Sequence, residues 1–140
     1  MKTLLILHVT AAGLWLGCVL TEALFERALL GQGEDAERLL ARLHGRVDLA
    51  VEIPALSLVA ISGGLLLRDV PMSPLLLAKI GFGLLALLAN AGCIALVRKR
   101  RSAAEAADWT AFRRLDQLQH RLGALVLTGL LGALGLGLGR

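Results

Sequence analysis

The stretch LLLAKIGFGLLALLANAGCIALV, residues 75–97, decides the fold, because it is almost wholly apolar and long enough to cross a lipid bilayer as one helix. An α-helix rises about 1.5 Å per residue, so about 20 residues cover the ~30 Å of hydrocarbon. Three further apolar stretches lie at about residues 4–25, 49–67 and 122–138. The sequence therefore predicts an all-α membrane protein with four transmembrane helices.

The composition of the whole chain agrees with this fold class. Its 140 residues are 56% hydrophobic, and the mean hydropathy is +0.72. A soluble domain of this size has too high a surface-to-volume ratio to bury so much apolar surface. We expect one domain over residues 1–140, since the four stretches leave no room for another.

The start of the chain allows two other interpretations. Lys2 before an apolar run could open a cleaved signal peptide, and Cys18 could mark a lipoprotein cleavage site. The run is longer than the ~7–15 apolar residues of a signal peptide, and no small-residue cleavage motif follows it. Trp15 also stands where a lipoprotein site needs a small aliphatic residue. We therefore expect a retained first span, with Cys18 and Cys93 as small buried side chains.

The basic residues predict how the chain sits in the membrane. They flank the spans, so the net charge of +4 does not indicate a nucleic-acid partner. Lys2, Arg68 and Arg140 lie on one side of the predicted bundle. Eleven others lie on the opposite side: Arg27, Arg38, Arg42, Arg46, Arg98, Lys99, Arg100, Arg101, Arg113, Arg114 and Arg121. The positive-inside rule then predicts an antiparallel bundle in a bacterial-type inner (plasma) membrane, with both termini on the non-cytoplasmic side.

Local signals predict where helices begin, bend and end. Glu34 and Asp35 suit the first turn of the second helix, because the helix macrodipole favours acids there. Pro54 lies inside that helix and should kink it. Residues 98–101 are expected in a cytoplasmic loop, and residues 102–108 in a helical extension that leads into the fourth span.

Each predicted helix carries one stripe of polar or ionisable residues at helical spacing. A charge that faces lipid costs at least ~2.5–3.5 kcal/mol, so the stripes should face the interior of the bundle. In chain order they contain His8, Trp15, Glu22 and Glu26; His44, Asp48 and Glu52; Lys79 and Asn90; and Asp116 and His120.

Depth along the helices divides these residues into an outer pair, His8 and Lys79, and an inner cluster near the cytoplasmic ends. Carboxylates and imidazoles on the inner faces of a four-helix bundle can bind metals, and mixed N/O ligands suit zinc, iron or manganese. We expect Glu22, His44 and His120 to converge on one divalent metal ion. The further candidate ligands are His8, Glu26, Asp48, Glu52 and Asp116.

Purely structural interpretations compete with these. The inner acids could pair with arginines that reach in from the loops, and residues at helix ends can extend to water. His8 could serve as a hydrogen-bonded packing residue, and Lys79 could extend to the outer surface.

Four motifs in register point to a known family. Residues 8–17, HVTAAGLWLG, are similar to an opening of the form His-x6-Trp-x-(Ala/Gly)-Gly, whose last position is Cys18 here. Arg46 precedes Pro54 and a GGLL segment at residues 63–66, the third stretch contains LAK at 77–79, and the fourth opens with FRRLD at 112–116. In this order they resemble the membrane-bound, haem-associated protoporphyrinogen oxidases of bacteria, and more loosely the copper-resistance D membrane proteins.

The resemblance implies a b-type haem with His8 as the iron ligand and Trp15 and Asn90 in the cofactor site. It implies a catalytic role for Lys79, which could neutralise a porphyrin propionate, and an oxidoreductase that acts on a porphyrin(ogen) with a quinone-type acceptor. It also allows a homo-oligomer. The chain departs from the family at Asn90, where a histidine is frequent, and at residues 116–119, DQLQ, which replace Asn-Glu-x-Pro.

Three functions therefore stay open at this stage. The first is a haem-binding membrane redox protein. The second is a transmembrane protein that binds or transports a metal ion (zinc, iron, manganese or copper) at the cluster of acids and histidines, of which Glu22, Glu26, His44 and His120 lie outside the family's motifs. The third is a structural subunit of a larger membrane complex.

Overall fold

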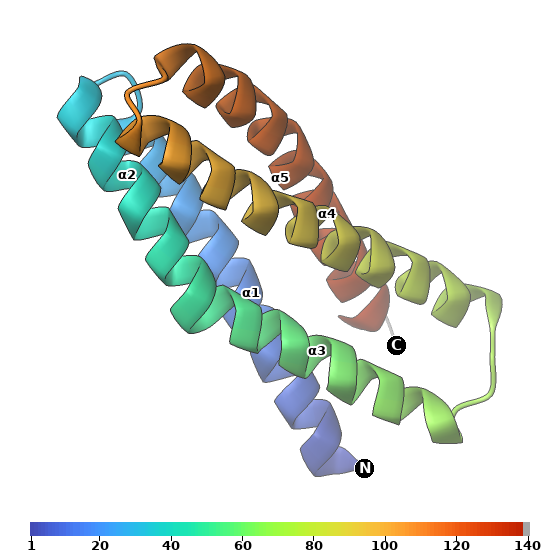
Figure 1. The fold of residues 1–140 in the computed structure, drawn as a ribbon. Helices are drawn as coiled ribbons and strands as arrows, with labels where there is room; N and C mark the ends of the chain where they lie inside the picture. The colour runs from blue at the N-terminus through green and yellow to red at the C-terminus, as the bar shows by residue number, and fades with distance from the viewer. Residues whose placement is uncertain (139–140) are drawn as a thin grey trace.

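A computed structural model describes residues 1–138; Gly139 and Arg140, including the expected side of Arg140, lie outside the described residues. Within residues 1–138 the protein consists of helices and turns, without a strand (Figure 1). In chain order the elements are α1 (Lys2–Leu29), α2 (Glu34–Val47), the π-helical turn η1 (Asp48–Glu52), α3 (Ile53–Leu66), the 3-10 turn η2 (Leu67–Asp69), α4 (Pro74–Glu105) and α5 (Trp109–Leu138).

Four helical units are long and apolar enough to cross a membrane, which confirms the expected all-α class. They are Lys2–Leu29, Glu34–Leu66, Pro74–Glu105 and Trp109–Gly137. The second begins at Glu34, as the acids there predict. The expected loop at residues 98–101 is wrong, because α4 continues through it to Glu105. This last part of α4 is stabilised by an Arg101–Glu105 ion pair of 2.9 Å and by the packing of Ala103 and Ala104 against α2 and α5.

Local chemistry explains the helix starts. Ser73 precedes α4, its side-chain oxygen accepts a hydrogen bond from the Leu76 N–H at 3.2 Å, and Pro74 occupies the first turn. Such a residue satisfies a backbone donor that the helix cannot, and proline needs no donor there. Asp108 plays the same part before α5, accepting from the Ala111 N–H at 3.0 Å.

The disturbance expected at Pro54 takes the form of a π-helical turn. Pro54 has no backbone N–H, so it cannot bond to a carbonyl of the preceding turn. Directly before it the Ile53 N–H donates to the Asp48 carbonyl oxygen, five residues back, and residues 48–52 form one widened turn. Both acids of this turn, Asp48 and Glu52, point into the bundle and are buried. Widened turns of this kind recur at functional sites.

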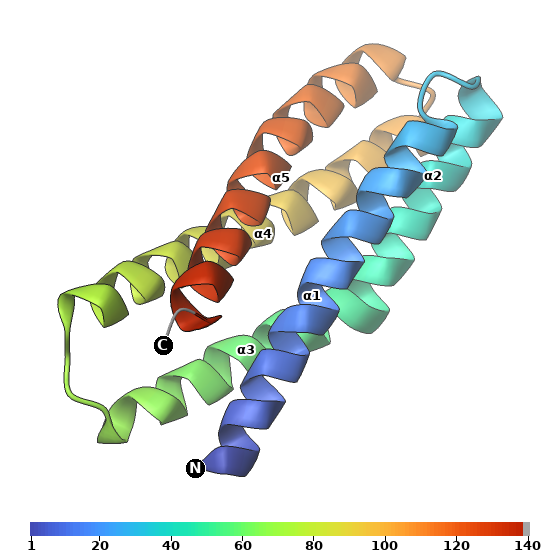
Figure 2. The same cartoon turned by 180° about the vertical axis from the view of Figure 1, so that it is seen from behind.

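The connections mark two ends of the bundle. The turns at residues 30–33 and 106–108 lie together at one end, which we call the basic end because most of the arginines are near it (Figures 1 and 2). The N-terminus and the connection at residues 70–73 lie at the other, which we call the terminal end.

Polarity is reversed relative to a soluble bundle. Leu88 is 73% exposed, and large apolar side chains such as Ile6, Leu24 and Leu49 cover the outside. Arg100, by contrast, is 0% exposed. An apolar exterior of this extent marks a surface made for lipid or for a partner, not for water.

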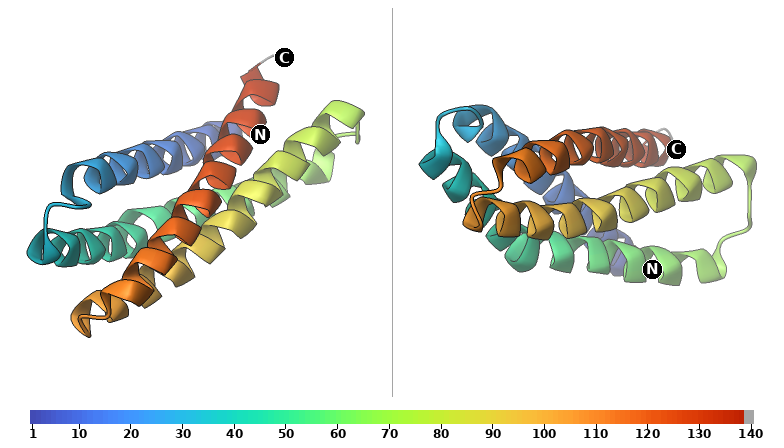
Figure 3. Two further views of the ribbon diagram at one scale, coloured as in Figure 1. Left: turned by 90° about the horizontal axis from the view of Figure 1, so that it is seen from above. Right: turned by 45° about the horizontal axis from the view of Figure 1, so that its top comes forward.

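Helix α5 packs closely on α4. A Cβ on Gly129 would lie 2.7 Å from the Phe82 carbonyl oxygen, and one on Gly132 would lie 2.7 Å from the Phe82 ring. Glycine is therefore required at this crossing, as in many membrane helix pairs. Against α1, in contrast, α5 makes few contacts, and Figure 3 shows these two helices inclined to each other. The polar site lies on this less tightly packed side.

Candidate metal centre

His44 is the centre of the polar cluster at the basic end. It projects from α2 and is buried, and each of its ring nitrogens faces a carboxylate from α1. Nδ1 lies 3.1 Å from Oε1 of Glu26, and Nε2 lies 3.3 Å from Oε2 of Glu22. Nε2 also lies 4.0 Å from Oδ1 of Asp48. Glu22 and Glu26 reach the same histidine because residues four apart share a helical face.

The π-helical turn adds two more buried acids to the cluster. Asp48 is 3% exposed, and neither of its carboxylate oxygens has a hydrogen-bond partner among the described residues. Glu52, 2% exposed, approaches Glu22 and Cys18 of α1. Two sets of three ligand atoms result, each with all atoms within 4.8 Å of one another: one from Glu22, His44 and Asp48, and one from Cys18, Glu22 and Glu52.

Arg100 is the functional residue that the sequence interpretation missed. It was expected in a loop, but it lies on α4 and is completely buried. Its Nη2 donates to Oε1 of Glu26, and its Nη1 donates to Oδ1 of Asp116 at 2.7 Å. Its guanidinium also lies 5.4 Å from the centre of the Phe112 ring, a cation–π distance. An extension of the inner stripe of α4 past Val97 by one turn would have predicted it.

His120 does not join His44 in one ligand set. Glu26, Asp116 and His120 form a separate group within 4.8 Å. His120 is half-exposed, and its Nδ1 lies 2.9 Å from the Asp116 carbonyl oxygen of its own helix. Since Arg100 already bridges Glu26 and Asp116, this third group is an ion-pair network. Of the three ligands expected to converge, the structure brings Glu22 and His44 together and adds Asp48 in place of His120.

The outer residues form a separate and smaller polar site near the terminal end. Nδ1 of His8 lies 2.9 Å from the Ser62 hydroxyl oxygen, and that hydroxyl donates to the Leu58 carbonyl oxygen. Lys79 extends toward α5, with its Nζ 2.9 Å from the position that a Cβ on Gly137 would take. Ser62 is a further residue that the motifs did not indicate.

Trp15 and Asn90 lie between the polar site near the terminal end and the cluster at the basic end. The Trp15 indole N–H donates to Oδ1 of Asn90 at 3.2 Å, and both side chains are completely buried in the middle of the bundle. The pair explains why the tryptophan and the asparagine follow the polar stripes of α1 and α4. The hydrogen bond links α1 to α4.

A cavity of about 360 Å³ opens beside the cluster. Its walls are mostly apolar side chains from α1 and α5, such as Val19, Leu20 and Leu127. Its polar lining consists of Glu22, Glu26, Arg27, His44, Glu52, Asn90, Gln119 and His120. Glu22, Glu52 and His44 can therefore be reached from the side on which α1 and α5 separate.

Comparison with family models, with curated proteins and with solved structures finds no match for this chain. The resemblance to the protoporphyrinogen oxidases thus stays a prediction from the four motifs. The function has to be argued from the residues themselves.

Proposed function

We propose that this chain is a multi-pass membrane protein that binds a divalent transition-metal ion within the bilayer, with Glu22, His44 and Asp48 as ligands. The Asp48 carboxylate carries the proposal, because it is almost fully buried and neither oxygen accepts a hydrogen bond from an N–H group or an alcohol among the described residues. A buried carboxylate is normally protonated, paired, hydrogen-bonded or bound to a metal. Its neighbours in the set are another carboxylate and an imidazole, which are ligands of zinc, iron and manganese.

The charges of the cluster support a bound cation. Arg100 and protonated His44 and His120 would supply three positive charges at most. Five carboxylates face them: Glu22, Glu26, Asp48, Glu52 and Asp116. Each uncompensated charge at membrane depth costs at least ~2.5–3.5 kcal/mol. Arginine pairing, the structural alternative, accounts for Glu26 and Asp116 but leaves the other three acids without a guanidinium in the part of the chain that the structure describes. One divalent ion would offset two of those three charges.

The surroundings of His44 suit a metal ligand. Metal-bound histidines usually donate their second ring N–H to a carboxylate, which fixes the orientation of the ring. Glu26 can accept from Nδ1 in this way, which leaves Nε2 directed at Glu22 and Asp48. Arg100 in turn fixes Glu26. Arg100 therefore supports the site and does not occupy it.

Metal binding by the full-length protein in detergent tests this function. We expect bound zinc, iron or manganese by elemental analysis, and Zn²⁺ binding in competition with a chelator. His44→Ala should abolish the binding, while His120→Ala, a matched histidine outside the set, should leave it within about twofold. If the protein binds no metal ion, or if both variants bind like the wild type, the proposal is wrong.

For the membrane arrangement we propose an antiparallel bundle in a bacterial-type inner membrane, with the basic end in the cytoplasm and both termini outside. The uneven distribution of arginine and lysine supports it. In a background with Cys18 and Cys93 replaced by serine, an impermeant thiol reagent on intact cells should label Met72→Cys but not Ala106→Cys. Labelling of Ala106→Cys alone would show the opposite orientation.

A second candidate function, haem binding at the terminal end, is favoured by the His8–Ser62 contact. Because the Ser62 hydroxyl donates to Leu58, its oxygen can accept from the Nδ1–H of His8. That tautomer leaves the Nε2 lone pair free to bind iron. A b-type haem there, with Lys79 near a propionate, would fit a redox protein that handles a porphyrin(ogen) and a quinone-type acceptor.

The haem candidate has its own test. Purified protein should show a Soret band, His8→Ala should remove it, and Lys79→Ala should weaken haem retention less, because it loses a charge partner and not an iron bond. An unchanged Soret band in His8→Ala would contradict the ligand assignment. Absence of the band in the wild type after growth with added haem would exclude this candidate and leave the metal site untouched.

A further inference from the structure

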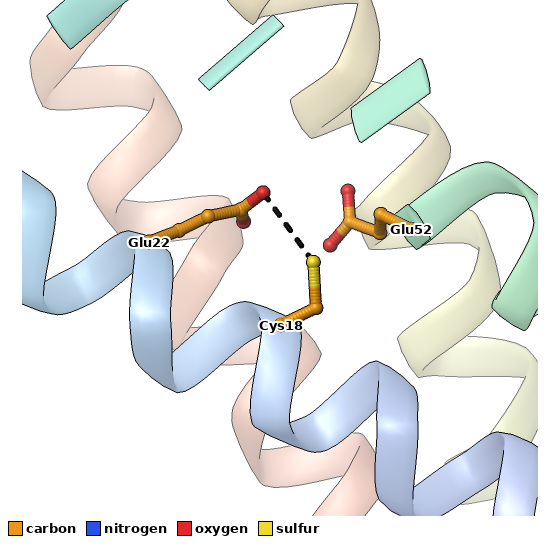
Figure 4. Close-up of side chains that lie close together, drawn as sticks. All are labelled: Cys18, Glu22 and Glu52. Atoms are coloured by element: carbon orange, nitrogen blue, oxygen red, sulfur yellow. Dashed lines mark hydrogen bonds between the residues drawn. The ribbon is translucent and has the colours of Figure 1, made fainter. Parts of the chain in front are cut away.

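The two oxygens of Glu22 face different ligand sets. Oε2 lies 3.3 Å from Nε2 of His44, and Oε1 accepts from the Cys18 thiol at 3.7 Å. Figure 4 shows the Cys18 sulfur between the carboxylates of Glu22, on the same helix, and Glu52, which approaches from the π-helical turn. One carboxylate thus borders both sets, with one oxygen toward each.

These separations suit metal ligands as well as the ion pair and the S–H···O hydrogen bond that the side chains form with each other. With bond lengths of ~2.0–2.3 Å, a tetrahedral zinc ion holds an imidazole nitrogen and a carboxylate oxygen about 3.4 Å apart, and a sulfur and an oxygen about 3.6 Å apart. The observed 3.3 Å and 3.7 Å agree with these values. The remaining ligand atoms lie within 4.8 Å, so both sets need side-chain shifts of about 1 Å to close on an ion.

We infer that the cluster is a dinuclear centre, in which the Glu22 carboxylate bridges one ion held by His44 and Asp48 and a second held by Cys18 and Glu52. The inference rests on the proposed function and extends it to a second site. It is supported by Asp48, which is buried beside both sets and accepts no hydrogen bond from an N–H group or an alcohol within residues 1–138, and by the Cys18, Glu22 and Glu52 ligand atoms, which all lie within 4.8 Å of one another. Carboxylate-bridged pairs of ions are held about 3.5–4 Å apart in other two-metal sites.

The donor atoms indicate which ion is bound. The first set offers one nitrogen and carboxylate oxygens, while the second offers a sulfur and carboxylate oxygens. A thiolate favours zinc over manganese or magnesium, and zinc accepts all of these ligands. The second ion also needs the Cys18 thiol to release its proton on binding. We therefore assign two zinc ions, with cobalt(II) as their spectroscopic substitute.

Cobalt(II) titration of the full-length protein, with metal content measured in parallel, tests the inference. The wild type should bind two Co²⁺ per chain and show a thiolate-to-cobalt charge-transfer band. Cys18→Ser should retain one ion and lose the band. Cys93→Ser, which changes a second thiol of the same bundle that lies in neither set, should keep both ions and the band.

The outcomes separate the two proposals. One ion per chain without the band in the wild type would overturn the dinuclear centre but keep the metal function. A band that survives Cys18→Ser and disappears in Cys93→Ser would also overturn it. If the wild type binds no ion, the proposed function itself fails.

Discussion

Helix α5 forms two very different contacts, and the difference indicates where the protein is built for stability and where for binding. Against α4 it approaches so closely that a single added methyl group on Gly129 would overlap the Phe82 carbonyl oxygen. Against α1 it leaves a cavity of about 360 Å³ with carboxylates and histidines in its lining. We call the first the closed seam and the second the open seam.

The two seams are lined by different kinds of side chain. Small apolar residues, Ala86, Gly129 and Gly132, make the closed seam, and no charge is needed there. At the open seam, by contrast, ionisable groups are held where a packed interior would exclude them. A closely packed pair of helices can supply the rigidity that lets the adjoining seam keep polar groups in fixed positions. Variants at the two seams should therefore affect different measurements.

The largest effect is expected for Asp48→Asn at the open seam. The change preserves size but removes the charge of a proposed ligand, so Zn²⁺ affinity should fall by about 100-fold or more, above the 10–100-fold typical of outer-shell changes. Chelator competition measures it. Asp35→Asn, an exposed acid at the start of α2, is the control and should change nothing. Equal affinities for Asp48→Asn and the wild type would remove Asp48 from the site.

Arg100→Gln should have the next largest effect. If Arg100 supports Glu26 and thereby His44, its loss should weaken Zn²⁺ binding by about 10–100-fold. If Arg100 instead neutralises the cluster in place of a metal, its loss should strengthen metal binding. The direction of the change in Zn²⁺ affinity therefore distinguishes these two roles of Arg100. Arg101→Gln, an exposed neighbour paired with Glu105, serves as the control. Thermal unfolding in parallel separates a loss of binding from a loss of folding.

The two seams also differ in how far the sequence could predict them. Helix class and the number of spans follow from local hydropathy, and the glycines of the last span indicate close packing without naming the partner helix. His44 and Glu22 could be predicted to meet, because each lies on a polar helical stripe near the same end.

Three features of the open seam needed the three-dimensional arrangement. Arg100 lies in a basic run that is typical of a loop, and its packing against Phe112 shows that it is internal. The four-residue spacing places Asp48 and Glu52 on the inner stripe, but it does not predict the π-helical turn that carries them. From the sequence Cys18 is predicted to be a small buried apolar side chain, and the structure shows that Glu52 of the turn lies beside it.

At the closed seam, Gly129→Ala should destabilise the protein by about 1–3 kcal/mol, the usual cost of overpacking. The new Cβ would lie 2.7 Å from a backbone oxygen, so the helices themselves must separate. Unfolding in detergent measures it. Gly135→Ala on the same helix, where nothing lies within 4 Å, should be neutral or slightly stabilising. Zn²⁺ affinity should be unaffected in Gly135→Ala. If Gly135→Ala lost as much stability as Gly129→Ala, the close packing would not be specific to Gly129.

The smallest effect is expected for Gly92→Ala, which tests how far the closed seam extends toward the basic end. Here the new Cβ would lie 3.0 Å from Cδ1 of Leu122, the flexible end of a partly exposed side chain that can rotate away. Replacing glycine within a helix gains about 0.5–1 kcal/mol, which offsets the adjustment of Leu122. The free energy of unfolding should therefore change by less than about 1 kcal/mol. A loss as large as that of Gly129→Ala would show that the close contact of α4 and α5 continues as far as Gly92.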